Sequence, residues 1–270
     1  MKFVDLHNDF LTKLNSKNIE TYLSKNKNYV SNIFSAIWTT ELKKPEKFIE
    51  KSHFLLKKLN TNINICLCLE DLGFVKDYKF LTKIKPYYCG LCWNNSNKFC
   101  GGINSKNSLT TKGKNLVNFL EKNNIIVDTA HMNKSSYNKF INISQKPIFC
   151  SHTGFYDIVK NKRNFCFGQL KDLVCSNGIV GLYFVGEYIS TKNNAKIEDV
   201  IKNIDYFVNK FGYKNLSIGT DFYGTNNLPY NLKDYSSLTN LKQELLKIGY
   251  KKHQIDAIFY KNYEKFKKRS

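Results

Sequence analysis

The chain lacks the features that would place it in a membrane or on a secretory route. No apolar run approaches the length of a bilayer-crossing helix, and the opening residues MKFVDLHND do not join a charged region to an apolar segment of signal-peptide length. Linkers, low-complexity tracts and Pro/Gly-rich hinges are missing as well. We therefore expect a single domain over residues 1–270 in a soluble, cytoplasmic protein that has no membrane partner.

Arginine is nearly absent from a strongly basic chain. Of 42 basic residues only Arg163 and Arg269 are arginines, and the formal net charge is +20. The lysines are spread along helix-like segments beside many asparagines, without a basic block interleaved with stacking aromatics. A solvated lysine-rich surface explains this pattern better than a nucleic-acid interface does, so we expect no nucleic-acid partner.

The cysteines stand mostly inside apolar runs, as Cys66, Cys68, Cys89, Cys92 and Cys150 do. In a reducing compartment free cysteine behaves as a small hydrophobe, so buried thiols are favoured over disulfides. Cys89 and Cys92 form a C-x-x-C motif, which also occurs in redox and metal pairs. Because an odd separation along a strand sends two side chains to opposite faces, a thiol redox function is disfavoured.

One unit recurs along the chain, a short apolar run followed by a segment with helical spacing. The eight runs are KFVDLH, SNIFSAIW, INICLCLE, PYYCGLCW, IIVDTAH, PIFCSH, IVGLYFV and LSIGTD. Between them, residues 196–212 carry an apolar stripe with Gly212 placed to end a helix, and residues 45–60 open with Pro45 in a first-turn position.

Buried strands that alternate with amphipathic helices indicate a parallel sheet covered by helices. Eight such units predict an α/β fold, a (β/α)8 TIM-type barrel in a single domain. A doubly wound open sheet is the competing fold. It would normally carry a glycine-rich phosphate loop after the first strand, and DLHNDF has no glycine there.

Titratable side chains stand at the ends of five of the predicted strands. They are His7 and Asp9 at the first, Glu70 at the third, His131 at the fifth, His152 at the sixth and Asp221 at the eighth. A single histidine in such a place is more often a hydrogen-bonded structural residue. Six such groups at one predicted face of a barrel favour a site for borderline divalent ions such as zinc. His53 and His253 lie in helix-like segments and are given no role.

The same motifs, in order, resemble the membrane (renal) dipeptidase family, whose members are binuclear zinc peptidases on an amidohydrolase-type barrel. The motifs are D-x-H-N-D, the glutamate that ends CLE, VDTAHM, FCSHTG followed by KRN, and IGTDFYG. The likeness runs over nearly the whole chain and includes NIFSAIWTT and SLTTKGKNLVNFL.

The resemblance implies a role for each strand-end residue. His7 and Asp9 would bind one zinc ion, His131 and His152 would bind a second, and Glu70 would bridge the two. Asp221 would shuttle protons, and Arg163 would hold the carboxylate of a dipeptide substrate. A hydroxide shared by the two ions would attack the peptide bond. The resemblance also allows a homodimer.

Arg163 has support that is independent of the resemblance. A chain that uses lysine almost everywhere places an arginine in NKRN, where the planar guanidinium would match a carboxylate in a bidentate fork. Without the resemblance, local capping or pairing would explain Arg163 equally well.

The sequence departs from the family at two places. Trp93 in LCWNN stands where the family usually has a histidine associated with substrate recognition, and the segment LYFVGEYI also differs. Trp93 is therefore a candidate substrate-binding residue that leaves side-chain preference open, although residue type alone would favour a core aromatic. At 270 residues the chain is also shorter than typical members, so trimmed loops around the pocket are expected.

Two other functions stay open at this point. Trp93 is compatible with another amide or ester hydrolase on the same metal site, such as an N-acyl amino acid deacylase or a lactonase. A non-catalytic basic binding protein on a degenerate barrel is the alternative from a different class. The complete set of ligand types argues against that alternative, because a decayed site would be expected to lose at least one of them.

Overall fold

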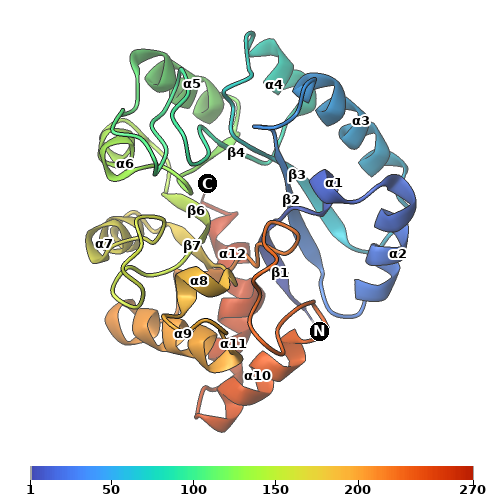
Figure 1. The fold of residues 1–270 in the computed structure, drawn as a ribbon, viewed down its shortest axis with the longest axis vertical. Helices are drawn as coiled ribbons and strands as arrows, with labels where there is room; N and C mark the ends of the chain where they lie inside the picture. Colours follow the sequence, from blue (N-terminus) through green and yellow to red (C-terminus); the bar gives the residue numbers. More distant parts are fainter. Residues whose placement is uncertain (1, 270) are drawn as a thin grey trace.

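The computed structural model describes residues 2–269, which form a closed barrel of parallel strands in the order β1 to β8. The strands are β1 (Val4–Asn8), β2 (Asn32–Trp38), β3 (Asn64–Glu70), β4 (Tyr88–Gly90), β5 (Ile126–Asp128), β6 (Phe149–Thr153), β7 (Ile179–Leu182) and β8 (Leu216–Ile218). Asp5 of β1 pairs with Ile218 of β8 and closes the sheet. The helices surround the strands (Figure 1), and the predicted (β/α)8 barrel is confirmed.

The helices follow the strands as the spacing predicts. They are α1 (Phe10–Lys13), α2 (Ser16–Asn26), α3 (Pro45–Lys58), α4 (Lys79–Ile84), α5 (Thr111–Lys122), α6 (Lys134–Ile141), α7 (Phe167–Cys175), α8 (Gly186–Ile189), α9 (Ile197–Phe211), α10 (Leu238–Lys247), α11 (Lys252–Asp256), the π-helix η1 (Ala257–Lys261) and α12 (Asn262–Phe266). Helix α9 ends at Gly212, which has φ 74° and bonds back to Val208. Among residues 2–269, no helix is both long and apolar enough to span a bilayer.

Two hydrophobic clusters hold the barrel together. The smaller cluster joins inward side chains of the strands, such as Phe34, Cys68 and Phe149, to Tyr263 and Phe266 of α12. The larger cluster lies between the strands and the surrounding helices. Because the helix α12 packs against residues near the beginnings of the strands, it covers the amino-terminal end of the barrel. The carboxyl ends remain free for a site.

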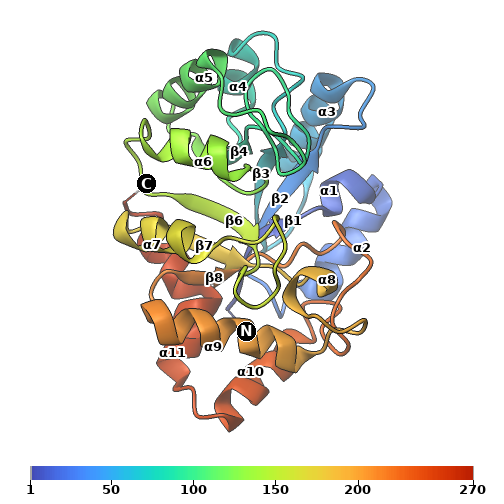
Figure 2. The same ribbon diagram turned by 60° about the vertical axis from the view of Figure 1, so that its left-hand side comes forward.

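The short helices α1 and α8 lie on the side of the barrel toward which β6 runs, whereas the chain's C-terminus lies on the other side (Figure 2). Both helices directly follow strands, α1 after β1 and α8 after β7. The loops at the carboxyl ends therefore frame one face of the molecule.

Two strands contain a β-bulge beside that face. Between Asp5 and Asn8, β1 advances three residues while β2 advances two, from Ile33 to Ser35. The same shift occurs in β6 between Cys150 and Thr153, opposite two residues of β7. An extra residue changes which side chains point inward. Each bulge contains a histidine, His7 in β1 and His152 in β6.

Candidate active site

A cavity of about 290 Å³ opens at the carboxyl ends of the strands. This volume is close to the lower limit of about 300 Å³ for small-molecule sites, which suits a small substrate. Seven of the predicted site residues line it, namely Asp9, Glu70, Trp93, His131, His152, Arg163 and Asp221. The eighth, His7, is buried directly behind them, and its ring stacks on that of His152 with centroids 3.7 Å apart.

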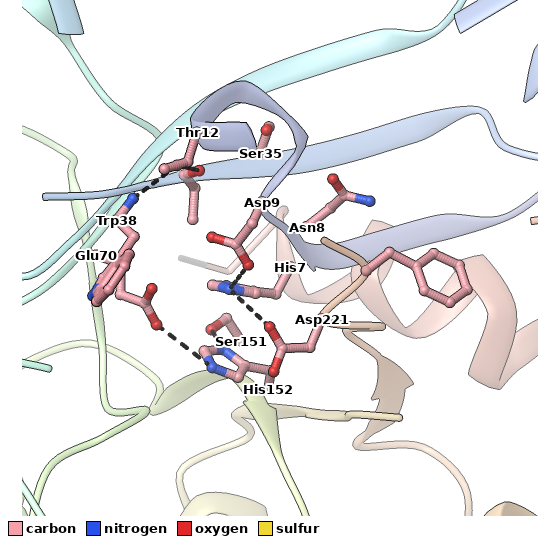
Figure 3. A network of polar contacts seen from close by, with 12 residues as sticks. His7, Asn8, Asp9, Thr12, Ser35, Trp38, Glu70, Ser151, His152 and Asp221 are labelled. Carbon is pink, nitrogen blue, oxygen red and sulfur yellow. Dashed lines mark hydrogen bonds and ion pairs between the residues drawn. The ribbon is translucent and has the colours of Figure 1, made fainter. Parts of the chain in front are cut away.

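His7 lies between two carboxylates, as Figure 3 shows. Its Nε2 is 3.2 Å from Asp9 Oδ2 and 3.8 Å from Asp221 Oδ1. Ligand atoms of these three residues all lie within 4.8 Å of one another. The three groups come from β1, from the residue directly after it, and from the loop after β8. Their spacing is compatible with one metal ion.

Glu70 lies among the other histidines. Its Oε1 is 2.7 Å from His131 Nε2 and 3.6 Å from His152 Nε2, and these two nitrogens are 3.0 Å apart. Glu70, His152 and His7 also offer ligand atoms within 4.8 Å of one another. A carboxylate that lies near all three histidines would be suited to serve two ions.

The three imidazoles all turn the same nitrogen toward the centre, because each Nδ1 contacts a group behind it. His7 Nδ1 is 2.8 Å from Tyr88 Oη, which donates to Leu6 O. His131 Nδ1 is 2.8 Å from Asn94 Oδ1. With Nδ1 as the donor in each contact, Nε2 is the nitrogen that each imidazole would offer to a cation.

The acceptor behind His152 is a hydroxyl with a partner of its own. Ser151 Oγ is 2.7 Å from His152 Nδ1 and donates to Asp128 Oδ2. Asp128 also accepts the backbone N–H groups of Ser151 and Ala130. The strand-end pattern did not identify four further functional candidates, which are Tyr88, Asn94, Ser151 and Asp128. Their nearness in sequence to predicted site residues was the available signal for Asn94, Ser151 and Asp128.

Burial and close charges shift the pKa values of the cluster. Burial opposes the charge on His7, but Asp9, Glu70 and Asp221 outweigh it and raise the pKa of His7 to about 10. Burial together with the Arg163 charge lowers the pKa of His131 to about 4. Burial would raise the pKa of Glu70, yet His131, His7 and Arg163 lower it to about 2. Glu70 is therefore an anion at neutral pH.

Two further observations indicate that the residues fit a cation. Asp9 Oδ1 is buried and has no hydrogen-bond partner within the described residues. Gly224 leaves room beside the carboxylates, since a Cβ there would stand 2.0 Å from Asp221 Oδ1 and 2.6 Å from Asp9 Oδ2. Carboxylate oxygens that face one another with few hydrogen-bond donors between them are typical of a metal site.

Arg163 is buried at the edge of this cluster. Its Nη2 donates to His131 Nε2 at 3.1 Å and to His152 O at 3.0 Å, and its guanidinium lies over the Tyr183 ring at 5.4 Å. Nη1 has no hydrogen-bond partner among residues 2–269. Asn161 Oδ1 accepts the Arg163 backbone N–H and helps to hold the loop. A buried donor without a partner is available to an anionic ligand.

The model of the membrane dipeptidase family, peptidase family M19, matches residues 34–268. The chain belongs to this family. A protein named dipeptidase aclJ, from Aspergillus oryzae, is 31% identical over 143 residues, which are 52% of this chain and 34% of that protein. The family and its dipeptidases support the predicted metallo-dipeptidase.

Solved structures share the membrane dipeptidase fold over the whole chain. Dipeptidase AC superposes with a TM-score of 0.90 at 18% identity, covering 100% of this chain and 99% of the other. A metallopeptidase from Rhodobacter sphaeroides, with a phosphinate mimic of L-Ala-D-Ala, gives 0.87 at 17% identity and the same coverage. At these identities the superpositions establish the fold.

Two of the predicted site residues lie farther from their strands than the sequence suggested. β5 ends at Asp128 and β8 at Ile218, so His131 and Asp221 stand in the loops beyond. Both have positive φ, 65° for His131 and 60° for Asp221. Such backbone is costly for a non-glycine residue and occurs often at functional sites.

The structure also shows the state of the cysteines and the position of Trp93, for both of which there were expectations from the sequence. All eight cysteines are free thiols, five of them buried. Cys89 and Cys92 are not on one strand, since β4 ends at Gly90, and Cys92 hydrogen-bonds with Cys100 instead. Trp93 is not a core aromatic; it is half-buried in the wall of the cavity.

Proposed function

We propose that the protein hydrolyses dipeptides with two zinc ions held at the mouth of the barrel. His7 and Asp9 would hold one ion, His131 and His152 the other, and Glu70 would serve both. The observation that carries the proposal is the shared orientation of three imidazoles, each with Nδ1 on a protein partner and Nε2 toward the centre. Family membership supports the metal dependence of the activity.

The bound ions would polarise the scissile carbonyl and supply a nucleophile from water at neutral pH. Every other part of the reaction falls to side chains of the cavity. Glu70, His131 and His152 are buried, and their charges and lone pairs are fixed before substrate arrives. Such preorganisation lowers the cost of charge development in the transition state.

Asp221 is the group suited to move a proton. Burial raises the pKa of this carboxyl well above its usual range, and Asp9 and Glu70 add to the rise against the opposing charges of His7 and Arg163. A carboxyl with a raised pKa can hold a proton and release it to a leaving amine. Asp221 lines the cavity, so a substrate amide can come within reach.

Arg163 would select substrates by length. Its Nη2 is 3.1 Å from His131 Nε2, so a carboxylate on this guanidinium lies next to the predicted metal cluster. A chain with further residues after the cut could not place its carboxylate there. The substrate would therefore end one residue after the scissile bond, as the L-Ala-D-Ala mimic of the Rhodobacter sphaeroides protein does.

The experiment is a hydrolysis assay of zinc-loaded protein on L,L and L,D dipeptides, with N-acyl amino acids and lactones beside them. We expect about two zinc ions per chain and turnover of dipeptides. Turnover confined to N-acyl amino acids or lactones would replace the dipeptidase with a deacylase or a lactonase. Zinc uptake close to zero would favour a non-catalytic protein.

A further inference from the structure

Both tryptophans of the chain stand side by side in the cavity wall. Trp38 ends β2 and Trp93 follows β4, and their ring centroids are 5.0 Å apart with planes tilted by 57°. The chain has no other tryptophan. Both rings are partly exposed and both line the cavity. Together they form a wall of apolar surface, here called the tryptophan wall.

The tryptophan wall adjoins the predicted metal ligands. Trp38 is the register partner of Glu70 on the neighbouring strand, so both side chains rise from the same face of the sheet, as Figure 3 shows. The Trp93 ring centroid is 6.0 Å from that of His131. A substrate group that extends from the predicted metal site on this side would therefore contact the two indole rings.

Arg163 enters the site beside His131, from a loop that lies across the barrel from Trp38. It follows β6, and in the closed order β1 to β8 the strand opposite β6 is β2, which carries Trp38. A dipeptide with its carboxylate on Arg163 and its scissile carbonyl over the cluster must extend away from Arg163. The part that extends is the residue on the amino side of the cut.

We propose that Trp38 and Trp93 form the subsite for the side chain of the substrate's N-terminal residue, and that this subsite selects bulky apolar and aromatic side chains. The inference rests on the proposed dipeptidase function. Tilted indole rings offer faces and edges to a third ring, the arrangement that aromatic groups prefer. Lys13 Nζ lies over the Trp38 ring at 5.5 Å and disfavours a cationic side chain there.

The tryptophan wall also gives the test a direct optical readout. Because Trp38 and Trp93 are the only tryptophans, intrinsic fluorescence of the zinc-loaded protein reports on this subsite. Phosphinate mimics of Phe-Ala and Ala-Ala serve as probes that are not hydrolysed. We expect the Phe mimic to change the emission and to bind at least about tenfold more tightly than the Ala mimic.

Substitutions separate the subsite from the rest of the site. Trp93→Ala should lower affinity for the Phe mimic far more than affinity for the Ala mimic, and so abolish most of the preference. Trp93→Phe keeps an aromatic ring and should retain the preference. The same pattern is expected for Trp38→Ala and Trp38→Phe. The ratio of kcat/KM for Phe-Ala over Ala-Ala should follow the binding ratios.

The outcomes distinguish the two proposals. Equal affinity of wild-type protein for both mimics, with turnover of dipeptides, would overturn the subsite and leave the dipeptidase standing. Equal loss of both affinities in Trp93→Ala and in Trp93→Phe would assign the tryptophan a structural role instead. No turnover of any dipeptide would remove the proposed function and the subsite with it.

Discussion

Ser151 Oγ lies 2.7 Å from His152 Nδ1 and donates a hydrogen bond to Asp128 Oδ2. A carboxylate, a hydroxyl and an imidazole thus form one chain behind the predicted metal site. The chain sets the tautomer of His152 and aims its Nε2 at Glu70 and His131. Partners of this kind orient a ligand without touching the metal.

Removing the Ser151 hydroxyl is therefore expected to weaken metal binding. Ser151→Ala should lower zinc affinity by about 10- to 100-fold, measured by competition with a chromophoric chelator. Ser217→Ala is the matched control, because Ser217 is equally buried in β8 and its hydroxyl donates to the backbone carbonyl of Ile258, away from the site. Equal affinities in the two variants would contradict a positioning role for Ser151.

Gly224 should not tolerate a side chain. In Gly224→Ala the new Cβ would come 2.0 Å from Asp221 Oδ1, so the carboxylates of Asp221 and Asp9 must move. Displacements of about 1 Å in a catalytic site can cost about 100-fold in rate, and we expect a loss of kcat/KM of that order. In the control Gly168→Ala the Cβ meets nothing closer than 4.0 Å, so kcat/KM should be unchanged.

Arg163→Ala is expected to raise KM for dipeptides. The increase should correspond to about 1.5 to 3 kcal/mol of lost binding free energy, the contribution of a charged hydrogen bond. Arg163→Lys keeps the charge without the planar fork and should recover only part of the loss. Because Arg163 also contacts His131, zinc affinity is measured for each variant. Arg269→Ala, at an exposed position, serves as the control. Unchanged KM in Arg163→Ala would remove the carboxylate-binding role.

Zinc binding should release protons at neutral pH. The pKa of His7 rises from 6.5 to about 10 in the metal-free fold, so its protonated form stabilises that fold; the contribution is complete below pH 6.5 and is lost as pH rises through about 10. Zinc must displace this proton. Calorimetry in buffers of different ionisation enthalpy should show release of at least one proton at pH 7.

The same linkage makes zinc affinity rise with pH. Each released proton corresponds to about a tenfold gain per pH unit, and the slope between pH 6 and 8 should be positive. His253→Gln changes a histidine of α11 outside the site and should leave the slope intact. A flat profile would show that His7 is already neutral in the metal-free protein.

Local pattern alone was sufficient to predict the barrel. Apolar runs and amphipathic segments depend on residues close in sequence, and so do helix ends such as Pro45 and Gly212, which the structure reproduces. The predicted site residues also come together, because parallel barrel strands present their carboxyl ends at one face whatever the loops between them. Their roles as metal ligands remain predictions that the experiments above test.

Tertiary structure decided how those side chains are aimed. The bulges in β1 and β6 turn His7 and His152 inward, and a bulge depends on the register between strands far apart in sequence. The partners Tyr88 and Asn94, the space at Gly224 and the meeting of Trp38 with Trp93 arise in the same way. The periodicity of apolar residues in the sequence specifies which helices and strands form. The contacts between elements that are distant in sequence exist only once the chain has closed the barrel.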